Sequence, residues 1–182
     1  MTQYILKLSF DLRQVTQSLA YEFALKDNSN YPMEGGGTLA GTFNFQQGDE
    51  IFVEVIASSA QHPGAPGTTP KDVLKDFIVT NCTFVSIPAR MTESLSLFDA
   101  TNACSTVNQW KPVKPPQEDD QRNFQQLCKR STTPLPVATK HGQWQISGYL
   151  SVELTTAAGK THAQLYFFDP EGSSGNGGGW KK

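Results

Sequence analysis

The sequence has no large excess of charge of either sign. Its 182 residues include 15 Lys and Arg against 17 Asp and Glu, so the formal net charge is only −2. Proteins that bind nucleic acid or anionic lipid carry a basic surface, and this composition does not provide one. We therefore expect no nucleic-acid partner.

Long apolar runs are also missing. Lys7 and then Asp11 interrupt the amino-terminal stretch, which therefore lacks the apolar run of roughly 7–15 residues that is typical of a secretory signal. No segment approaches the roughly 20 apolar residues that span a bilayer as a helix. These features predict a cytoplasmic protein with no membrane partner.

Metal-binding patterns are absent. The three cysteines, Cys82, Cys104 and Cys128, are spaced too widely to form a C-x-x-C pair. The histidines are equally scattered and form neither an H-x-H nor an H-E-x-x-H motif. We expect no metal and no cofactor. The cysteines are expected to be free thiols, and the alternative is one disulfide with a spare thiol.

Catalytic motifs are absent as well. The sequence has no G-x-S-x-G, no P-loop and no G-x-G-x-x-G that opens a helix. Asp49, Glu50 and Glu54 offer carboxylates of the kind that hydrolyse glycosidic bonds. Glu50 and Glu54, however, fall on the polar phase of a strand, where outward acids favour solubility and protect sheet edges. We therefore expect a protein that is not an enzyme.

The sequence is rich in the period-two alternation of half-buried strands. Polar and apolar residues alternate over residues 4–13, 19–26 and 50–56, and residues 77–87 have β-type composition. The strongest local signal is a carboxyl-terminal hairpin with strands at 144–154 and 162–168 and a turn at 157–160. Gly48-Asp49 indicates a further tight turn of the hairpin type.

Helical signals are few. Thr69, Pro70 and Asp72 have the order of an N-cap, a first helical residue and a first-turn acid, which predicts a short helix. A second helix is expected over residues 118–130, where acids lead, bases follow and apolar residues have helical spacing.

These patterns predict an all-β fold. Seven to nine short strands separated by Gly and Pro turns favour an antiparallel two-sheet β-sandwich, immunoglobulin-like or jelly-roll-like, with one or two short helices. We expect a single domain over residues 1–171. The Gly- and Ser-rich residues 172–182 have the composition of a flexible tail.

One family resemblance can be stated. The Gly-rich loop that leads into GTFNFQQGDEI at 41–51, and the closing segment from Tyr149 through Gly159 to LYFFDP at 165–170, resemble the PixA/AidA-type bacterial inclusion-body family. The resemblance implies a bacterial, cytoplasmic β-sandwich that accumulates or assembles, with a role linked to population density or host association. It implies no catalytic residues.

We accordingly expect a non-enzymatic protein that self-associates as a homo-oligomer or acts as an accessory binding protein. The alternative is a carbohydrate-binding, lectin-like module, because loop aromatics beside polar residues commonly form sugar-binding faces. Three aromatic residues in loop-type sequence are the candidate contacts with a ligand or partner: Tyr31, Trp110 and Trp180. The same residues could instead be plugs that close the ends of the sheets.

Overall fold

The computed structural model describes residues 1–26, 43–59, 69, 71, 73–88, 94–99, 101–115, 125–138, 142–168 and 171–174. This part of the chain is all β and contains no α-helix. Its twelve strands are β1 (Gln3–Asp11), β2 (Ala20–Leu25), β3 (Phe43–Phe45), β4 (Glu50–Ser59), β5 (Leu74–Pro88), β6 (Cys104–Thr106), β7 (Trp110–Val113), β8 (Gln125–Ser131), β9 (Leu135–Pro136), β10 (Gly142–Thr156), β11 (Thr161–Phe168) and β12 (Glu171–Ser174).

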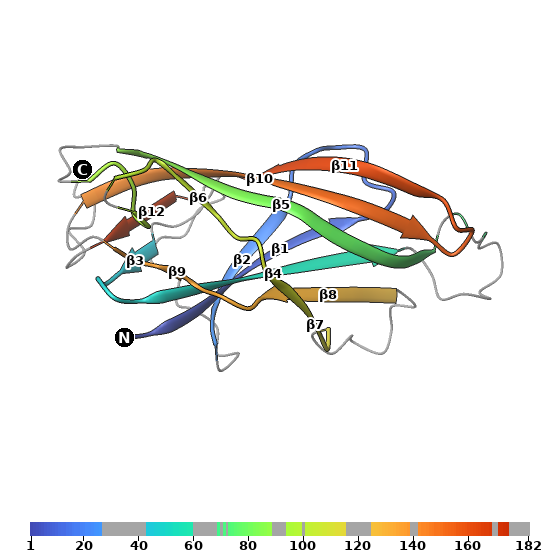
Figure 1. The fold of residues 1–182 in the computed structure, drawn as a ribbon, viewed down its shortest axis with the longest axis horizontal. Helices are drawn as coiled ribbons and strands as arrows, with labels where there is room; N and C mark the ends of the chain where they lie inside the picture. Colours follow the sequence, from blue (N-terminus) through green and yellow to red (C-terminus); the bar gives the residue numbers. More distant parts are fainter. Residues whose placement is uncertain are drawn as a thin grey trace, which may run out of the picture.

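The strands form two six-stranded sheets in a sandwich-like arrangement. Sheet A has the order β2-β1-β4-β8-β7, and β9 pairs with β4. Sheet B has the order β3-β12-β10-β5-β6, and β11 pairs with β10. In Figure 1, β10, β5 and β11 run along the top of the molecule, while β4 and β8 run along the bottom.

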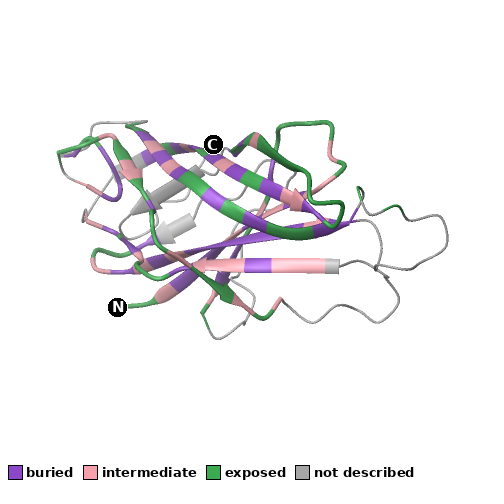
Figure 2. Cartoon of the chain, turned by 45° about the vertical axis from the view of Figure 1, so that its right-hand side comes forward, coloured by how far each residue is buried: buried purple, intermediate pink, exposed green. Residues whose placement is uncertain are grey.

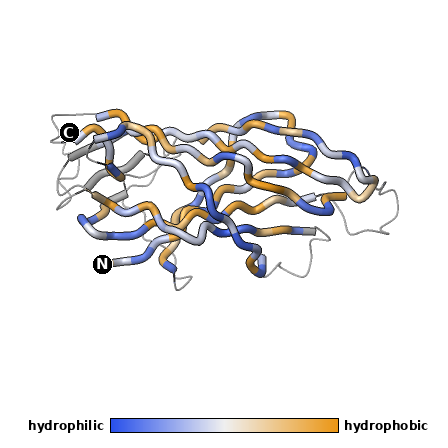
Figure 3. Tube along the Cα trace, in the orientation of Figure 1, coloured by the Kyte–Doolittle hydropathy of each residue, from blue (hydrophilic) through white to orange (hydrophobic). Residues whose placement is uncertain are grey.

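The alternation in the sequence places the core between the two sheets. Tyr4, Leu6, Leu8 and Phe10 of β1 are buried in one core cluster with the alternate residues of β10. Figures 2 and 3 show the same alternation along the strands, as buried against exposed residues and as hydrophobic against hydrophilic ones. The predicted all-β, two-sheet fold is therefore confirmed, and each sheet buries one face against the other.

The prediction that all strands are antiparallel is wrong for two pairs. β1 pairs with β4 in parallel over their length, and β12 pairs with β3 in parallel. The reason is the path of the chain: β3 belongs to sheet B, so β4 returns to sheet A beside β1 and runs in the same direction. Alternation reports which face is buried but not which strand is the neighbour.

The helix expected over residues 118–130 is wrong where the structure describes it. Gln125–Ser131 is strand β8, which pairs with β4 and β7. Pairing on both sides satisfies the backbone groups of this segment, which outweighs a weak helical spacing. The helix expected from Thr69 cannot continue past Val73, because β5 begins at Leu74; residues 70 and 72 lie outside the described part.

The turn predicted at Gly48-Asp49 is present, and it connects the two sheets instead of closing a hairpin. Gly48 has a φ of +90°, which glycine adopts without a Cβ penalty. The buried Asp49 carboxylate accepts hydrogen bonds from the backbone N–H of Thr2 at 2.7 Å and of Gln46 at 2.8 Å. β3 and β4, which flank the turn, lie in different sheets.

The predicted carboxyl-terminal hairpin is confirmed. β10 and β11 pair from Thr155 with Thr161 to Gly148 with Phe168, and β12 then pairs with β10 in the same register. Residues 172–174, which composition assigns to the tail, belong to β12; residues 175–182 lie outside the described part. In the residues that the structure describes, no helix has the length and apolarity needed to cross a bilayer.

Gly148 is required where the hairpin packs on the core. The Phe168 ring lies over this glycine, and a Cβ at residue 148 would stand 2.1 Å from Phe168 Cζ. Phe168 is buried and contacts Phe84 edge-to-face with ring centroids 5.2 Å apart, so the ring has little room to move.

We therefore predict that Gly148→Ala lowers the free energy of unfolding by about 1–3 kcal/mol, the usual cost of overpacking a core. Urea denaturation followed by tryptophan fluorescence measures this change. Ser151→Ala, at a half-buried position three pairs along the same strand, is the control and should change stability by less than about 0.5 kcal/mol. Equal stability of the two variants would contradict this account of Gly148.

Candidate binding pocket and open strand edge on sheet B

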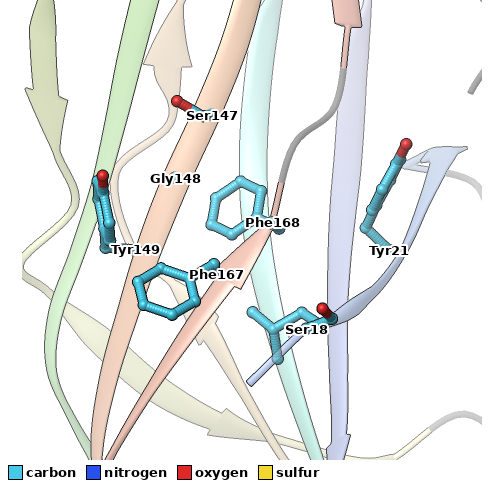
Figure 4. Close-up of a pocket in the computed structure, with 8 residues that line it drawn as sticks. Ser18, Tyr21, Ser147, Gly148, Tyr149, Phe167 and Phe168 are labelled. Carbon is cyan, nitrogen blue, oxygen red and sulfur yellow. The ribbon is translucent and has the colours of Figure 1, made fainter. Parts of the chain in front are cut away.

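A pocket of about 370 Å³ lies on one side of the sandwich, where the chain crosses from sheet B to sheet A. Ser18 forms a parallel bridge with Phe167 of sheet B, and two residues later Ala20 pairs with Ser9 of sheet A. The pocket lies beside this crossing, between β2 and the β10–β11 hairpin (Figure 4). Its lining residues are Ser18, Leu19, Tyr21, Ser147, Gly148, Tyr149, Phe167 and Phe168.

Aromatic rings form much of the pocket wall. Tyr149 and Phe167 are cross-strand partners on the outer face of sheet B, and their rings meet edge-to-face at 5.4 Å and 81°. Tyr149 is 43% exposed and Phe167 is 38% exposed, so two large side chains in contact with each other are accessible to a ligand. Tyr21 of β2 lies across from them in Figure 4.

The pocket lining carries no charge. Half of the eight lining residues carry a hydroxyl group, namely Ser18, Tyr21, Ser147 and Tyr149, and none is acidic or basic. The pocket therefore offers flat apolar surface together with hydroxyl donors and acceptors. It suits a neutral ligand, because a buried ion would lack a compensating charge here.

β11 presents an open edge next to the pocket. The Thr156 N–H donates to the Lys160 carbonyl at 2.9 Å across the β10–β11 pair. Because hydrogen-bonded and non-hydrogen-bonded pairs alternate in antiparallel strands, the even-numbered residues of this hairpin direct their backbone N–H and carbonyl groups toward the partner strand. The odd-numbered residues direct their backbone groups away from β10. Phe167 shows this directly, because it donates to the Gln17 carbonyl at 2.7 Å and accepts from Leu19 N–H at 2.9 Å.

The bonds at Phe167 do not continue along the strand. Thr161, Ala163 and Leu165 have the same backbone orientation as Phe167, and no strand in the described part of the chain pairs with them on that side. Ala163 is exposed and Leu165 is 41% exposed, so their edge is open to solvent. We call residues 161, 163 and 165 the β11 edge.

Two other strand edges, those of β7 and β5, carry features that block pairing. β7 contains Pro112, which has no N–H, and Lys111. Where β6 does not cover β5, Lys129 donates to the Phe77 carbonyl and forms an ion pair with Asp76 at 3.2 Å. The β11 edge has neither proline nor Lys, Arg, Asp or Glu in its sequence, THAQL. It lacks the usual protection against pairing with another chain.

The outer face of sheet A contrasts with this surface. A row of charged residues crosses the sheet, with Glu22 paired to Lys7 at 3.6 Å and Glu54 paired to Arg130 at 2.6 Å. Glu54 faces outward as its polar phase predicts, but it is almost completely buried under its neighbours. Because Arg130 compensates the charge of this carboxylate, the pair provides no free group for chemistry.

Among the three expected contact residues, the structure describes Trp110. Trp110 is in the edge strand β7 of sheet A, is half-buried and packs against the core. It does not line the pocket on sheet B. Tyr31 and Trp180 lie outside the described residues. Their roles, and that of Trp110 as a contact, stay predictions.

Sequence reasoning missed Tyr21, Tyr149 and Phe167. Tyr149 has a detectable signal, because it is an aromatic residue on the polar phase of β10, between Ser147 and Ser151. Phe167 has none, because residues 165–168 are continuously apolar and either phase could face the core.

All three cysteines are free, as the sequence spacing favoured, and they differ in burial. Burial raises the pKa of the Cys82 thiol to about 12. Burial, and secondly the neighbouring Glu54 carboxylate, raises the pKa of the Cys128 thiol. Cys104 is exposed on β6. Because the thiolate is the reactive form, Cys82 and Cys128 should be inert in the folded protein.

Comparison with protein-family models, curated proteins and solved structures finds no match to this chain.

We predict that one thiol per folded chain, Cys104, reacts rapidly with a disulfide reagent such as DTNB at pH 8, and that all three react after unfolding. Raising the pH to 9 should not expose a second rapid thiol, because the other two pKa values lie well above this range. Cys104→Ser should abolish the rapid phase. A rapid phase that persists in this variant would contradict the assignment.

Proposed function

We propose that the protein is a non-enzymatic, self-associating protein that forms a homodimer through the β11 edge. The observation that supports this proposal most is the row of unpaired backbone groups at Thr161, Ala163 and Leu165, which continues the orientation used at Phe167. Unpaired edge groups form a ready template for a strand from another chain. A second copy supplies such a strand.

The sequence of the β11 edge fits a twofold antiparallel pairing centred on Ala163. In this register Ala163 faces its own copy, and Leu165 faces Thr161 of the partner. Each facing residue directs both its N–H and its carbonyl toward the other chain, as in a hydrogen-bonded antiparallel pair. The small methyl groups of two facing alanines allow close approach, and no like charges meet at the twofold axis.

The outer face of sheet B gives further support. Five of the eight exposed large hydrophobic residues in the described part of the chain lie on it: Ile78, Ile87, Tyr149, Leu165 and Phe167. Pairing at the β11 edge would bring two such faces into one continuous sheet and shield Leu165 against its partner. Burial of this apolar surface would add to the backbone hydrogen bonds.

The resemblance to the PixA/AidA-type family, which implies a protein that accumulates or assembles, agrees with this proposal. Membership of that family, the cytoplasmic location and an immunoglobulin-like or jelly-roll-like topology belong to the proposal as well.

Light scattering coupled to size-exclusion chromatography tests the proposal with the variant Ala163→Lys. The wild-type chain should shift from monomer to dimer as its concentration increases. In the variant, two lysines would face each other at the twofold axis, and this repulsion should raise the dissociation constant at least about tenfold. Monomer stability should hardly change, because residue 163 is exposed.

Ser151→Lys is the matched control, since it adds the same charge to the same face of sheet B, on the interior strand β10. It should dimerise like the wild type. A wild-type chain that stays monomeric at high concentration would contradict self-association. Dimers unaffected by Ala163→Lys would contradict the β11 edge as the interface.

A further inference from the structure

We propose that the pocket between β2 and the β10–β11 hairpin is a binding site for a neutral pyranose sugar with equatorial hydroxyls, such as a β-glucoside. The site consists of Ser18, Tyr21, Ser147, Tyr149 and Phe167. It is separate from the β11 edge, and the inference does not rest on dimer formation.

The aromatic pair supports a ring-shaped ligand. An edge-to-face pair leaves at least one flat ring face uncovered by its partner, and both Tyr149 and Phe167 are partly exposed. The axial C–H groups of a glucose-type pyranose form a flat apolar face of similar size. Stacking this face on Tyr149 or Phe167 removes apolar surface of both partners from water.

The hydroxyl groups support a sugar over a purely apolar ligand. Ser18 and Tyr21 come from the crossing segment and β2, whereas Ser147 and Tyr149 come from β10, so hydroxyls stand on both sides of the pocket (Figure 4). The hydroxyls around the rim of a pyranose can donate to and accept from such groups. A purely apolar ligand would displace water from the hydroxyl groups of Ser18, Ser147 and Tyr149 without replacing the hydrogen bonds of that water.

Backbone hydrogen bonds and packing hold both walls of the pocket in place. Two backbone hydrogen bonds hold residues 17–19 against Phe167, and Gly148 allows Phe168 to pack beneath the aromatic pair. Both walls are therefore attached to sheets and not to a single loop. A volume of about 370 Å³ lies within the usual range of small-ligand pockets, roughly 300–1,000 Å³.

Saturation-transfer NMR with the full-length protein tests the inference, with methyl β-D-glucopyranoside and cellobiose as neutral probes and D-glucuronate as a charged one. The neutral sugars should receive saturation mainly at their axial C–H protons, with millimolar affinity. D-glucuronate should bind at least about tenfold more weakly, because the pocket offers its charge no partner. Equal binding of the charged and neutral probes would overturn the assignment.

Tyr149→Ala should weaken binding of the neutral probes at least about tenfold, because it removes an exposed stacking face. Tyr21→Phe, which keeps the ring and removes one hydroxyl, should weaken it less. Ile87→Ala is the control, since it truncates an exposed residue of the same sheet that does not line the pocket. The absence of any transfer to both neutral sugars, or equal binding by Tyr149→Ala and the wild type, would overturn the inference.

The Ala163→Lys variant separates this site from the dimer interface. Residue 163 does not line the pocket, so a monomeric variant should bind the neutral sugars as the wild type does. Loss of sugar binding together with loss of the dimer would contradict the separation of the two surfaces.

Discussion

Two backbone hydrogen bonds at Phe167 connect the pocket with the β11 edge. They hold residues 17–19 against β11 at the point where the chain leaves sheet B and enters sheet A as β2. The crossing forms the second wall of the pocket. Because residues 17–19 pair with Phe167 alone, they also define where the β11 edge begins.

The outer faces of the two sheets carry different kinds of side chain. Sheet A covers its outer face with a row of paired charges, which includes the buried pair of Glu54 and Arg130. Sheet B has hydroxyl-bearing and apolar residues at the centre of its outer face, with Tyr149 and Phe167 most prominent. Exposed apolar side chains gain from being covered by a partner, whereas charges that are already paired within sheet A gain little. The asymmetry therefore favours sheet B as the surface for a partner and a ligand.

The sequence predicted the local structure better than the site. Alternation located β1, β4 and the β10–β11 hairpin, because each buries one face. It could not reveal the parallel pairing of β1 with β4, since register and neighbours depend on the whole chain path. It also placed the candidate contacts in loops. The pocket instead uses strand residues, such as Tyr149, whose exposure depends on what packs over the outer face of the sheet.

Hydrogen exchange of the β11 amides, followed by NMR at two protein concentrations, tests the central claim most directly. The N–H of Phe167 is bonded to Gln17 and should exchange slowly at both concentrations. The N–H groups of Ala163 and Leu165 should exchange rapidly in the dilute monomer and become protected as the protein is concentrated. Rapid exchange of both groups at high concentration would contradict the account of the β11 edge.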